Sequence, residues 1–390
     1  MAKRNAHGAG SIRQRPDGTW EARYTLGRDS GTGKQVRKSV YGKTQAEVRK
    51  KLAQVTVAVD EGTYTEPSKL TVGTWLDIWL DEYISNTVKP TTLHNYRKCC
   101  RTYLMPHLAA IKLSSLNAPT IQKMINGLQS GEDGRKGLAP KTIKNIYGVL
   151  HKALQQAVKL GFIRTNPADA CDLPRITKKE IKPLDKEQIS DFLNAIKGHE
   201  FETLYLVTLF TGIRQSECLG LCWRCVDFDK GVITINAQLV RDYANGGYYF
   251  DESTKSNKAR QITPAKFIMT ELKKHRVEQL KARMLVGGAW VDGDYVFTNE
   301  LGEHLKHVTV YKGYKRIVAE LGIPNSRYHD LRHSYAVAAL HAGDDVKTVQ
   351  ENLGHHTAAF TLDQYGHVTE QMKQESANRM DMYFRGIKQG

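Results

Sequence analysis

Between residues 214 and 365 the chain carries side chains whose types could together cleave a phosphodiester bond. They are two arginines, a lysine, two histidines and a tyrosine: Arg214, Lys255, His329, Arg332, His355 and Tyr365. A tyrosine hydroxyl has an ordinary pKa near 10, so about one in a thousand is ionised at pH 7. It attacks phosphorus only where cations stabilise the phenolate and the charge that develops on the phosphate. These residue types therefore predict a cationic site around a tyrosine.

The other residue types suit the remaining steps of such a cleavage. Each guanidinium could hold nonbridging phosphate oxygens through paired hydrogen bonds, which would fix the phosphate in line with its attacker. Histidine titrates near neutral pH and can pass protons to and from the attacking and leaving oxygens. Lysine can protonate a 5′-hydroxyl leaving group. Because guanidinium groups supply the positive charge, we expect no metal ion and no cofactor.

Several of these residues have a plainer explanation when each is taken singly. The turn at residues 211–214 is typical of a helix end followed by a solvated arginine. His329 and His333 are spaced i, i+4 and could bind zinc from one face of a helix. Arg332 would oppose the charge of such a metal, and Asp330 stands where a zinc protease needs glutamate. A zinc hydrolase stays open as an alternative, and activity that survives a chelator would exclude it.

Local patterns predict the elements that carry these side chains. Arg214 follows an apolar helix at residues 204–210, Lys255 lies in a hairpin between two strand candidates, and His329 opens a helix directly after Tyr328. The strand candidates are residues 232–235, 248–250, 261–263 and 295–297. The rest of this region is mostly helical.

Composition and the positions of prolines and glycines divide the chain into three parts and a linker. Residues 1–66 read as three strands and a helix, and residues 70–167 as four or five helices separated by prolines. Residues 168–183 suit a linker, and residues 184–390 form one large domain. The predicted fold class is therefore mainly α with small β elements (α+β).

The first part has the clearest local signals. Its strands are predicted at residues 11–13, 20–26 and 35–41, and its helix at residues 43–59. Thr44 and Glu47 have the spacing of a capping box at the start of that helix. Trp20 and Tyr41 are expected in the core between the sheet and the helix.

Charge and composition exclude several classes of protein. Lys and Arg total 57 against 41 acidic residues, a net charge of +16, which favours a polyanion, and nucleic acid before membrane, as partner. No apolar run reaches the roughly 18 residues of a membrane span, and the N-terminus lacks a signal peptide's apolar stretch. Six cysteines are too few for a disulfide scaffold, and the helical pattern around Cys218, Cys222 and Cys225 favours core positions over a metal site. We expect a soluble cytosolic protein.

Taken together, these residues resemble the tyrosine recombinase (phage integrase) family, of the type found in temperate phages and conjugative transposons of Gram-positive bacteria. Order and spacing agree at Arg214, Lys255, the His-x-x-Arg element of His329 and Arg332, His355 in Leu-Gly-His, and Tyr365 ten residues later. Residues 70–167 resemble the family's helical core-type DNA-binding domain. Residues 1–66 resemble its three-stranded arm-type DNA-binding domain, and residues 184–390 its catalytic domain.

The resemblance implies a function and residue roles. Tyr365 would attack the scissile phosphate to give a 3′-phosphotyrosine, and Lys255 would be the general acid to the 5′-oxygen. The remaining roles would be phosphate binding by Arg214 and Arg332, proton transfer by His329, a hydrogen bond to a nonbridging oxygen from His355, and support from Glu217 and His333. The enzyme would integrate and excise a mobile element through a Holliday junction without metal or ATP.

The resemblance also implies double-stranded DNA as partner, at arm-type and core-type attachment sites, and a place in the bacterial cytosol in association with the nucleoid. In the first part a narrow sheet could enter the major groove, which predicts DNA contacts from Arg13, Arg15, Arg23, Tyr24, Arg37 and Lys38. In the helical part the family's helix starts are matched by Lys89, Thr91, Thr92, Lys141 and Thr142.

Assembly and rival functions complete the expectations. The tail at residues 369–390 is expected to dock on a neighbouring protomer in a DNA-bound tetramer, although packing on its own domain is the alternative. An excisionase and a host DNA-bending protein are possible further partners. A recombinase that resolves chromosome dimers or inverts DNA is the alternative function, and a DNA-binding regulator without catalysis is a weaker one.

Overall fold

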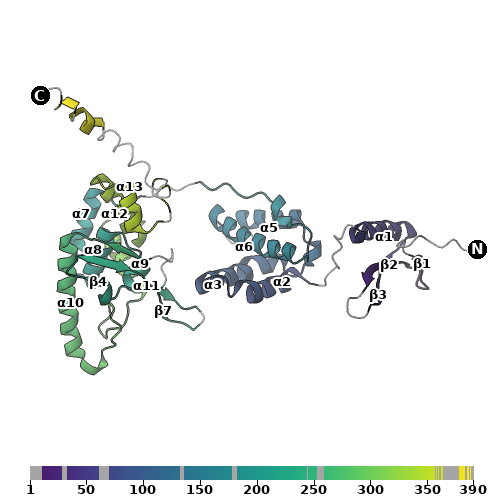
Figure 1. Ribbon diagram of the computed structural model, residues 1–390, viewed down its shortest axis with the longest axis horizontal. Coiled ribbons are helices and arrows are strands. Elements are labelled where there is room, and N and C mark those ends of the chain that lie inside the picture. Colours follow the sequence, from purple (N-terminus) through teal and green to yellow (C-terminus); the bar gives the residue numbers. More distant parts are fainter. Residues whose placement is uncertain are drawn as a thin grey trace, which may run out of the picture. The chain divides into compact units, whose positions relative to one another are not determined.

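A computed structural model of the chain describes residues 11–28, 33–60, 70–131, 136–177, 182–243, 245–252 and 259–355. Beyond them it describes only residues 357, 359, 362, 377–382, 384, 385 and 387. The chain forms two compact units, Met1–Thr177 and Lys178–Gly390 (Figure 1). The first unit contains a small sheet with one helix, followed by a helical part. None of the helices in the described ranges is long and apolar enough to cross a membrane.

The N-terminal sheet is antiparallel, with the strand order β1-β2-β3. Its strands are β1 (Ser11–Gln14), β2 (Trp20–Arg28) and β3 (Gln35–Gly42), and helix α1 (Gln45–Asp60) contacts all three. One of the two bonds of the predicted capping box forms at the start of α1, and the side chain of Glu47 bonds to the residue before the N-cap. The N–H of Glu47 donates to Thr44 Oγ1 at 3.2 Å, and Glu47 Oε2 accepts from the N–H of Lys43 at 2.9 Å.

The helical part consists of packed helical segments between residues 70 and 173. They are α2 (Val72–Ile78), η1 (Trp79–Ile84), α3 (Pro90–Cys99), η2 (Cys100–Leu104), α4 (Met105–Leu108), η3 (Leu113–Ser115), α5 (Ala118–Ser130), α6 (Pro140–Lys159) and η4 (Pro167–Ala170). Trp75 lies at the centre of its core, and its indole N–H donates to the carbonyl of Ala153 at 3.0 Å. Packing continues past the predicted linker start, because Ala168 is buried and Leu173 lies against this core.

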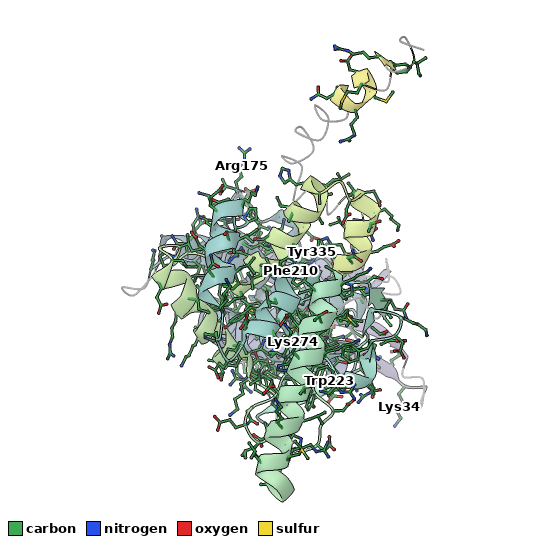
Figure 2. All side chains as sticks on the ribbon, turned by 90° about the vertical axis from the view of Figure 1, so that its left-hand side faces the viewer. Lys34, Arg175, Phe210, Trp223, Lys274 and Tyr335 are labelled. Atoms are coloured by element: carbon green, nitrogen blue, oxygen red, sulfur yellow. The ribbon has the colours of Figure 1, made fainter. Side chains whose placement is uncertain are left out.

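The C-terminal unit is built of helices around small sheets (Figures 1 and 2). Its helices are α7 (Lys186–Ala195), α8 (Glu202–Thr211), α9 (Gln215–Leu219), η5 (Trp223–Cys225), α10 (Lys266–Val286), η6 (Gly287–Ala289), α11 (His307–Glu320), α12 (Tyr328–His341) and α13 (Val346–Leu353). Its strands are β4 (Val226–Asp227), β5 (Val232–Ile235), β6 (Gln238–Arg241), β7 (Tyr248–Asp251) and β8 (Arg260–Ile262). The predicted class, mainly helical with small β elements, is confirmed.

Helix α8 lies in the middle of the core of this unit. The phenol of Tyr205 donates to the carbonyl of Val310 in α11 at 3.0 Å, and Thr208 shares a hydrogen bond of 2.6 Å with the hydroxyl of Tyr328 in α12. Helix α12 begins at Tyr328, one residue before the predicted start at His329. These bonds fix α12 against α8, so the residues at the end of α8 face the first turns of α12.

Two strand predictions were wrong in this unit. Strand β7 pairs with β6, and β8 pairs with β5, so the strands on either side of residues 253–258 do not pair as a hairpin. Residues 295–297 contribute only an isolated bridge between Tyr295 and Cys222 rather than a strand. Strand β6 was not predicted. It pairs with β7, so the partner of β7 precedes it in the sequence instead of following it.

Candidate active site

Arg214 lies at the junction of α8 and α9. Helix α8 ends at Gly212, whose φ of +66° is a left-handed conformation, and a β-carbon there would lie 2.4 Å from the ring of Tyr335. Only glycine therefore allows the sharp turn that follows. Arg214 then caps α9, because its backbone N–H donates to Glu217 Oε2 at 2.9 Å and its Nη1 donates to Glu217 Oε1 at 2.7 Å.

Glu217 is a buried carboxylate between two arginines. Its side chain is fully buried, and Arg260 Nη1 and Nη2 donate to Oε1 at 3.1 Å and to Oε2 at 2.6 Å. Burial alone would raise the pKa of Glu217, but the hydrogen bond and charge of Arg260, followed by the charge of Arg214, lower that pKa to about 2. Glu217 is therefore ionised at all working pH values and binds Arg214 through both of its oxygens.

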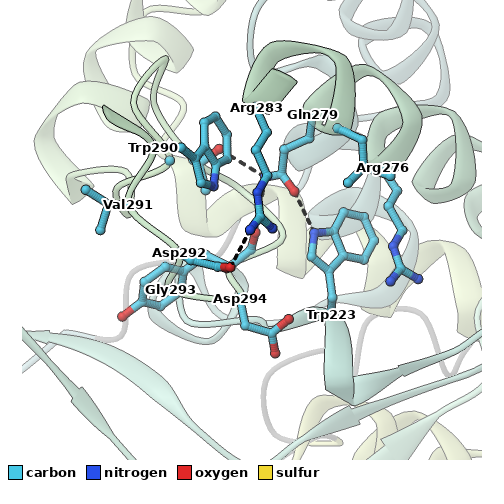
Figure 3. Close-up of a pocket in the computed structure, with 13 residues that line it drawn as sticks. Trp223, Arg276, Gln279, Arg283, Trp290, Val291, Asp292, Gly293 and Asp294 are labelled. Atoms are coloured by element: carbon cyan, nitrogen blue, oxygen red, sulfur yellow. Dashed lines mark hydrogen bonds and ion pairs between the residues drawn. The ribbon is translucent and has the colours of Figure 1, made fainter. Parts of the chain in front are cut away.

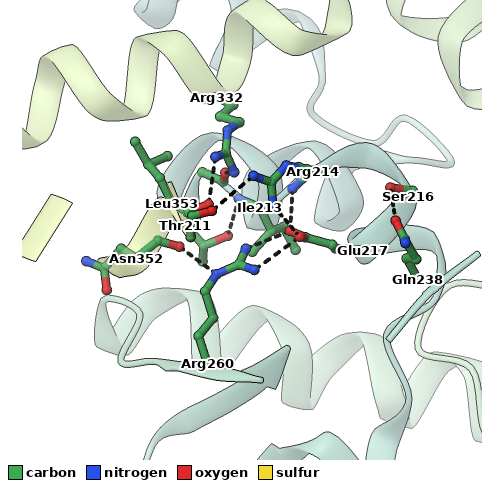
Figure 4. A network of polar contacts seen from close by, with 12 residues as sticks. Thr211, Ile213, Arg214, Ser216, Glu217, Gln238, Arg260, Arg332, Asn352 and Leu353 are labelled. Atoms are coloured by element: carbon green, nitrogen blue, oxygen red, sulfur yellow. Dashed lines mark hydrogen bonds and ion pairs between the residues drawn. The ribbon is translucent and has the colours of Figure 1, made fainter. Parts of the chain in front are cut away.

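The end of α13 receives a hydrogen bond from each of three arginines (Figure 4). Three successive carbonyls accept them: Asn352 from Arg260 Nε at 2.9 Å, Leu353 from Arg332 Nη2 at 2.6 Å, and Gly354 from Arg214 Nη2 at 3.1 Å. Backbone carbonyls at a helix end have no partner within the helix and carry partial negative charge. The guanidinium groups satisfy these carbonyls and hold the turn before His355.

Arg332 and Arg214 differ in how accessible they are. Arg332 is 2% exposed, and its Nη1 also donates to the carbonyl of Gly212 at 2.6 Å, so it joins the end of α8 to the end of α13. The side chain of Arg214 is 20% exposed. The two guanidinium groups thus meet at one place, with that of Arg214 nearer to solvent.

Three histidines surround these arginines. The rings of His329 and His333, on the first turns of α12, make an edge contact with 4.8 Å between their centres. Desolvation, then the charges of His333 and Arg332, lower the pKa of His329 to about 4, although the residue keeps an exposed surface. Desolvation also lowers the pKa of His333 to about 4.

His355 follows the turn at the end of α13. Desolvation, then the charges of Arg332 and Arg214, lower its pKa to about 3, and the two other histidines add smaller effects. All three imidazoles are consequently neutral at pH 7, each with one ring nitrogen that donates and one that accepts. A group of two guanidinium ions and neutral imidazoles can bind an anion and still accept a proton.

The structure brings together part of the predicted catalytic set. Arg214, His329, Arg332 and His355 share one site with Glu217 and His333, as the contacts and electrostatic effects above demonstrate. Lys255 and Tyr365 lie outside the described residues. Their place in the site stays a prediction.

Arg260 belongs to this site and was not among the predicted site residues. A single arginine at the start of a strand is ordinarily solvated, so its residue type carried no signal. Its partners Glu217 and Asn352 are distant in sequence and become its neighbours only in the folded chain.

No other chemistry is indicated in the part of the chain that is described. Within it, no group of three or more histidine, cysteine or acidic side chains could hold a metal ion. Cys218 and Cys222 are buried, and burial raises the pKa of their thiols to about 12 and about 11. The core positions of Cys218 and Cys222 are as predicted, whereas Cys225, also expected in the core, is only half-buried.

A small cavity of about 120 Å³ lies beside α10 (Figure 3), and none of the three arginines at the end of α13 lines it. Its polar groups bond to one another: the indole N–H of Trp223 donates to Gln279 at 2.6 Å, and Arg283 pairs with Asp292 at 2.8 Å. Contacts of this kind hold the surrounding loop in place, and we assign the cavity no ligand.

The predicted DNA contacts of the first part divide between the two faces of its sheet. Strand pairing puts Arg13 beside Glu21, Arg23 beside Ser39 and Arg37 beside Thr25 on the face opposite α1. We call this the open face. Glu21 lies on this face, and its carboxylate accepts hydrogen bonds from Arg13 Nε at 2.7 Å, Arg23 Nε at 3.1 Å and Ser39 Oγ at 2.8 Å. The hydrogen bond from Ser39, then that from Arg13, lowers the pKa of Glu21 to about 2.

Aromatic residues of this sheet depart from the predictions. Tyr24 and Lys38 pair with each other on the face toward α1, where Tyr24 is buried at 6% exposure. Tyr41, expected in the core, is 49% exposed and lies on the open face with the guanidinium of Arg15 5.5 Å from its ring centre. The core prediction for Tyr41 was wrong because strand alternation pairs it with Glu21 and turns it from the helix. Trp20 is partly buried.

The predicted DNA contacts of the helical part lie at two helix starts. Lys89 is the N-cap of α3, with Thr91 and Thr92 in its first turn, and Lys141 and Thr142 lie in the first turn of α6. Lys89 and Lys141 are exposed. Backbone N–H groups at such helix starts face outward and suit phosphate oxygens.

Comparison with known proteins gives two family matches. Residues 182–372 match the model described as "Phage integrase family", and residues 71–129 match "Phage integrase, N-terminal SAM-like domain". The first match contains every residue of the site described above.

Individual proteins match over most of the chain. A tyrosine recombinase XerC-like protein of Caldanaerobacter subterraneus subsp. tengcongensis is 30% identical over 92% of this chain and 95% of its own. The ICEBs1 integrase of Bacillus subtilis is 25% identical over 95% of this chain and 99% of its own. The structure of a Tn1549 transposon integrase in complex with a circular intermediate DNA has the same fold, with a TM-score of 0.67 and 23% identity over 80% of this chain and all of that chain.

Proposed function

Because the chain belongs to the phage integrase family of tyrosine recombinases, we propose that it is a site-specific recombinase that integrates and excises a mobile element. The observation that carries this proposal is the meeting of Arg214, Arg332 and the neutral imidazoles of His329 and His355 at the end of α13. Tyr365 follows that turn by ten residues.

The cleavage step transfers the 3′-phosphoryl group of the DNA from the 5′-oxygen to the protein. The hydroxyl oxygen of Tyr365 attacks the scissile phosphorus while the bond to the 5′-oxygen breaks, which leaves a 3′-phosphotyrosine and a 5′-hydroxyl. His329, neutral at pH 7, accepts the tyrosine proton, and Lys255 gives a proton to the leaving 5′-oxygen. Since one phosphodiester replaces another, the reverse attack by a 5′-hydroxyl of the partner strand needs no ATP.

The arginines and His355 stabilise the pentacoordinate phosphorus. Arg214 and Arg332 donate to its nonbridging oxygens, and His355 donates from one ring nitrogen. The carbonyls of α13 and the carboxylate of Glu217 already fix the orientation of these groups, so little reorganisation is needed when DNA binds.

The DNA-binding surfaces follow from the placement of the basic residues. The open face of the N-terminal sheet, with Arg13, Arg23 and Arg37 and with Arg15 at its edge, contacts the arm-type site in a groove. We leave Tyr24 and Lys38 out of this surface because they lie toward α1. The starts of α3 and α6 contact the core-type site. The Tn1549 transposon integrase, which has the same fold, was solved in complex with a circular intermediate DNA.

Assembly on DNA uses the C-terminal tail. Met380, Met382, Phe384 and Ile387 of the tail are exposed, and their apolar surface suits a neighbouring protomer in a tetramer. An excisionase and a host DNA-bending protein would set the direction of the reaction on the bacterial chromosome.

Covalent trapping tests the proposal. Wild type and Tyr365→Phe are incubated in EDTA with nicked DNA that carries the element's own end, and SDS-resistant protein–DNA adducts are measured. We expect an adduct with wild type only. An adduct with both proteins would exclude Tyr365 as the nucleophile, and none with either would favour a regulator without catalysis. A parallel reaction without EDTA tests the zinc alternative, which requires DNA cleavage without an adduct there and no cleavage in EDTA.

Resolution of chromosome dimers or inversion of DNA is the second candidate, and the Caldanaerobacter relative is named a tyrosine recombinase rather than an integrase. A recombination assay with two identical sites, compared with a pair of unlike attachment sites, separates the two functions. Recombination of identical sites without arm-type DNA would support the resolving enzyme.

A further inference from the structure

Three arginines meet at the end of α13, and the proposed chemistry uses two of them. The third, Arg260, is the first residue of β8 and is bound on all sides: its Nη atoms contact Glu217 and its Nε contacts the carbonyl of Asn352. Its side chain is 10% exposed, half the exposure of the Arg214 side chain. Because its Nε and both Nη atoms already donate to groups of the protein, we look for the role of Arg260 within the protein.

The first consequence of Arg260 concerns the orientation of Arg214. A carboxylate offers roughly four lone-pair positions. On Glu217 these are taken by the backbone N–H and Nη1 of Arg214 and by the two Nη atoms of Arg260. Arg260 thus takes one position on each carboxylate oxygen. This leaves Glu217 a single orientation in which it can hold Arg214.

The second consequence concerns the turn that carries His355. Asn352, Leu353 and Gly354 give successive carbonyls to Arg260, Arg332 and Arg214. Gly354 has a φ of +62°, and a β-carbon there would lie 3.0 Å from Arg260 Nη1, so this turn is built closely around Arg260. Without Arg260 the end of α13 would lose one of its three anchors.

The third consequence concerns the segment before β8. Arg260 pairs with Ile235 in the sheet of β4, β5 and β8, which fixes its backbone. Lys255 precedes it by five residues. Arg260 is therefore the point at which the strand after Lys255 is joined to α9 and α13.

We propose that Arg260 is a positioning residue for DNA cleavage, which holds Arg214 and the His355 turn against the same phosphate by bridging Glu217 and the end of α13. This inference rests on the proposed function. Lysine cannot replace Arg260, because a single ammonium cannot reach two carboxylate oxygens and a carbonyl with the planar geometry of a guanidinium.

The test compares Arg260→Lys and Arg260→Gln with wild type in single-turnover formation of the covalent adduct at saturating DNA. Each protein is given two nicked substrates, one with the natural scissile phosphate and one with a neutral methylphosphonate there. DNA affinity and melting temperature are measured in parallel. Arg214→Ala is the reference for a lost phosphate contact. Arg283→Gln is the matched control, because Arg283 also pairs with a carboxylate but does so at the exposed side of α10.

We expect both Arg260 variants to bind DNA within about twofold of wild type and to cleave the natural phosphate about tenfold to a hundredfold more slowly, the range caused by small misplacements of reacting groups. On the methylphosphonate the loss should shrink, as for Arg214→Ala, because a neutral phosphorus centre depends less on aligned positive charge. Arg283→Gln should match wild type on both substrates.

Two results would overturn the inference. One is wild-type cleavage by both Arg260 variants. The other is an equal loss on the two substrates together with a lowered melting temperature, which would make Arg260 a contributor to folding only. Failure of the proposed function is distinguishable, since wild type itself would then form no adduct through Tyr365.

Discussion

At the residue scale, the charge on Glu217 decides how the candidate site is organised. Its carboxylate is surrounded by donors from Arg214 and Arg260, and their charges keep its pKa at about 2 in spite of its burial. A buried carboxylate with two guanidinium partners leaves the group net positive, as a phosphate site requires. The arginines keep their orientation before DNA arrives because this ion cluster is already complete.

Substituting Glu217→Gln should destabilise the protein strongly. The amide places an N–H against arginine donors and leaves two guanidinium ions without a counter-charge, which costs about 3 kcal/mol when a buried pair is broken. Urea unfolding measures the change. Glu278→Gln is the control, because Glu278 pairs with Lys281 at the surface and should change stability by less than about 0.5 kcal/mol. Equal effects of the two substitutions would contradict this account.

The pH dependence of cleavage follows from the histidines. The pKa of His329 is about 4 and that of His355 about 3 in the DNA-free protein. Both imidazoles therefore stay neutral down to about pH 5, and His329 can still act as a base there. At subsaturating DNA, adduct formation reports the free protein, and we expect its acid limb below pH 5 rather than near the ordinary histidine value of about 6.5. A limb near pH 6.5 would show that His329 titrates normally.

The same shifts set the sign of stability against pH. A histidine whose folded pKa is lowered takes up a proton on unfolding between its folded and unfolded values. The contribution of His333 is therefore complete above about pH 6.5 and is lost as the pH falls toward 4.

At the element scale, helix ends rather than helix interiors build the site. Helix α8 ends at Gly212 and α13 at Gly354, both with positive φ, and Arg332 donates to a carbonyl at each end. Such turns place carbonyls and the following side chains at one point. The first turns of α12 complete the site with His329, Arg332 and His333.

The turn after α8 should tolerate no side chain. In Gly212→Ala the new β-carbon would meet Tyr335 at 2.4 Å and Leu353 at 2.7 Å, in addition to the strain of a positive φ. Gly231→Ala is the matched control, with a φ of +67° and open space around the β-carbon. We expect Gly231→Ala to cost about 1 kcal/mol in urea unfolding and Gly212→Ala clearly more, with a drop in adduct formation only for the latter. Equal costs would mean that Tyr335 gives way.

At the scale of the whole molecule, the sheet, the helical part and the C-terminal unit each have buried residues of their own. The basic residues proposed for arm-type and core-type DNA lie on different parts. Changes to the open face of the sheet should therefore alter arm-type binding and leave cleavage at the core-type site intact.

Salt dependence of arm-type binding tests this separation. Replacing Arg15 and Arg37 with alanine removes two charges of the open-face surface without touching Glu21, and the slope of log K against log salt should fall by about 1.8. The control replaces Arg49 and Lys50, exposed on α1, which removes equal charge from the other side. A larger fall in slope for the control protein would indicate that the DNA-binding surface lies on α1. Adduct formation on core-type DNA should not change in either protein.

Much of the local structure was predictable because it depends on near neighbours in the chain. The three N-terminal strands, the bond between Thr44 and Glu47, helix α8 and the start of α12 within one residue follow from periodicity and turn chemistry over a few residues. The same is true of the residue types at the site, whose order and spacing indicated the family.

Tertiary packing decided which of these elements and side chains meet. The pairing of β7 with β6, the outward position of Tyr41, and the bridge from Arg260 to Glu217 and Asn352 were not predicted. Each depends on contacts between residues that are distant in sequence or on which face of a sheet a helix covers. The type of a single residue does not predict such contacts, because they form only when whole elements pack together.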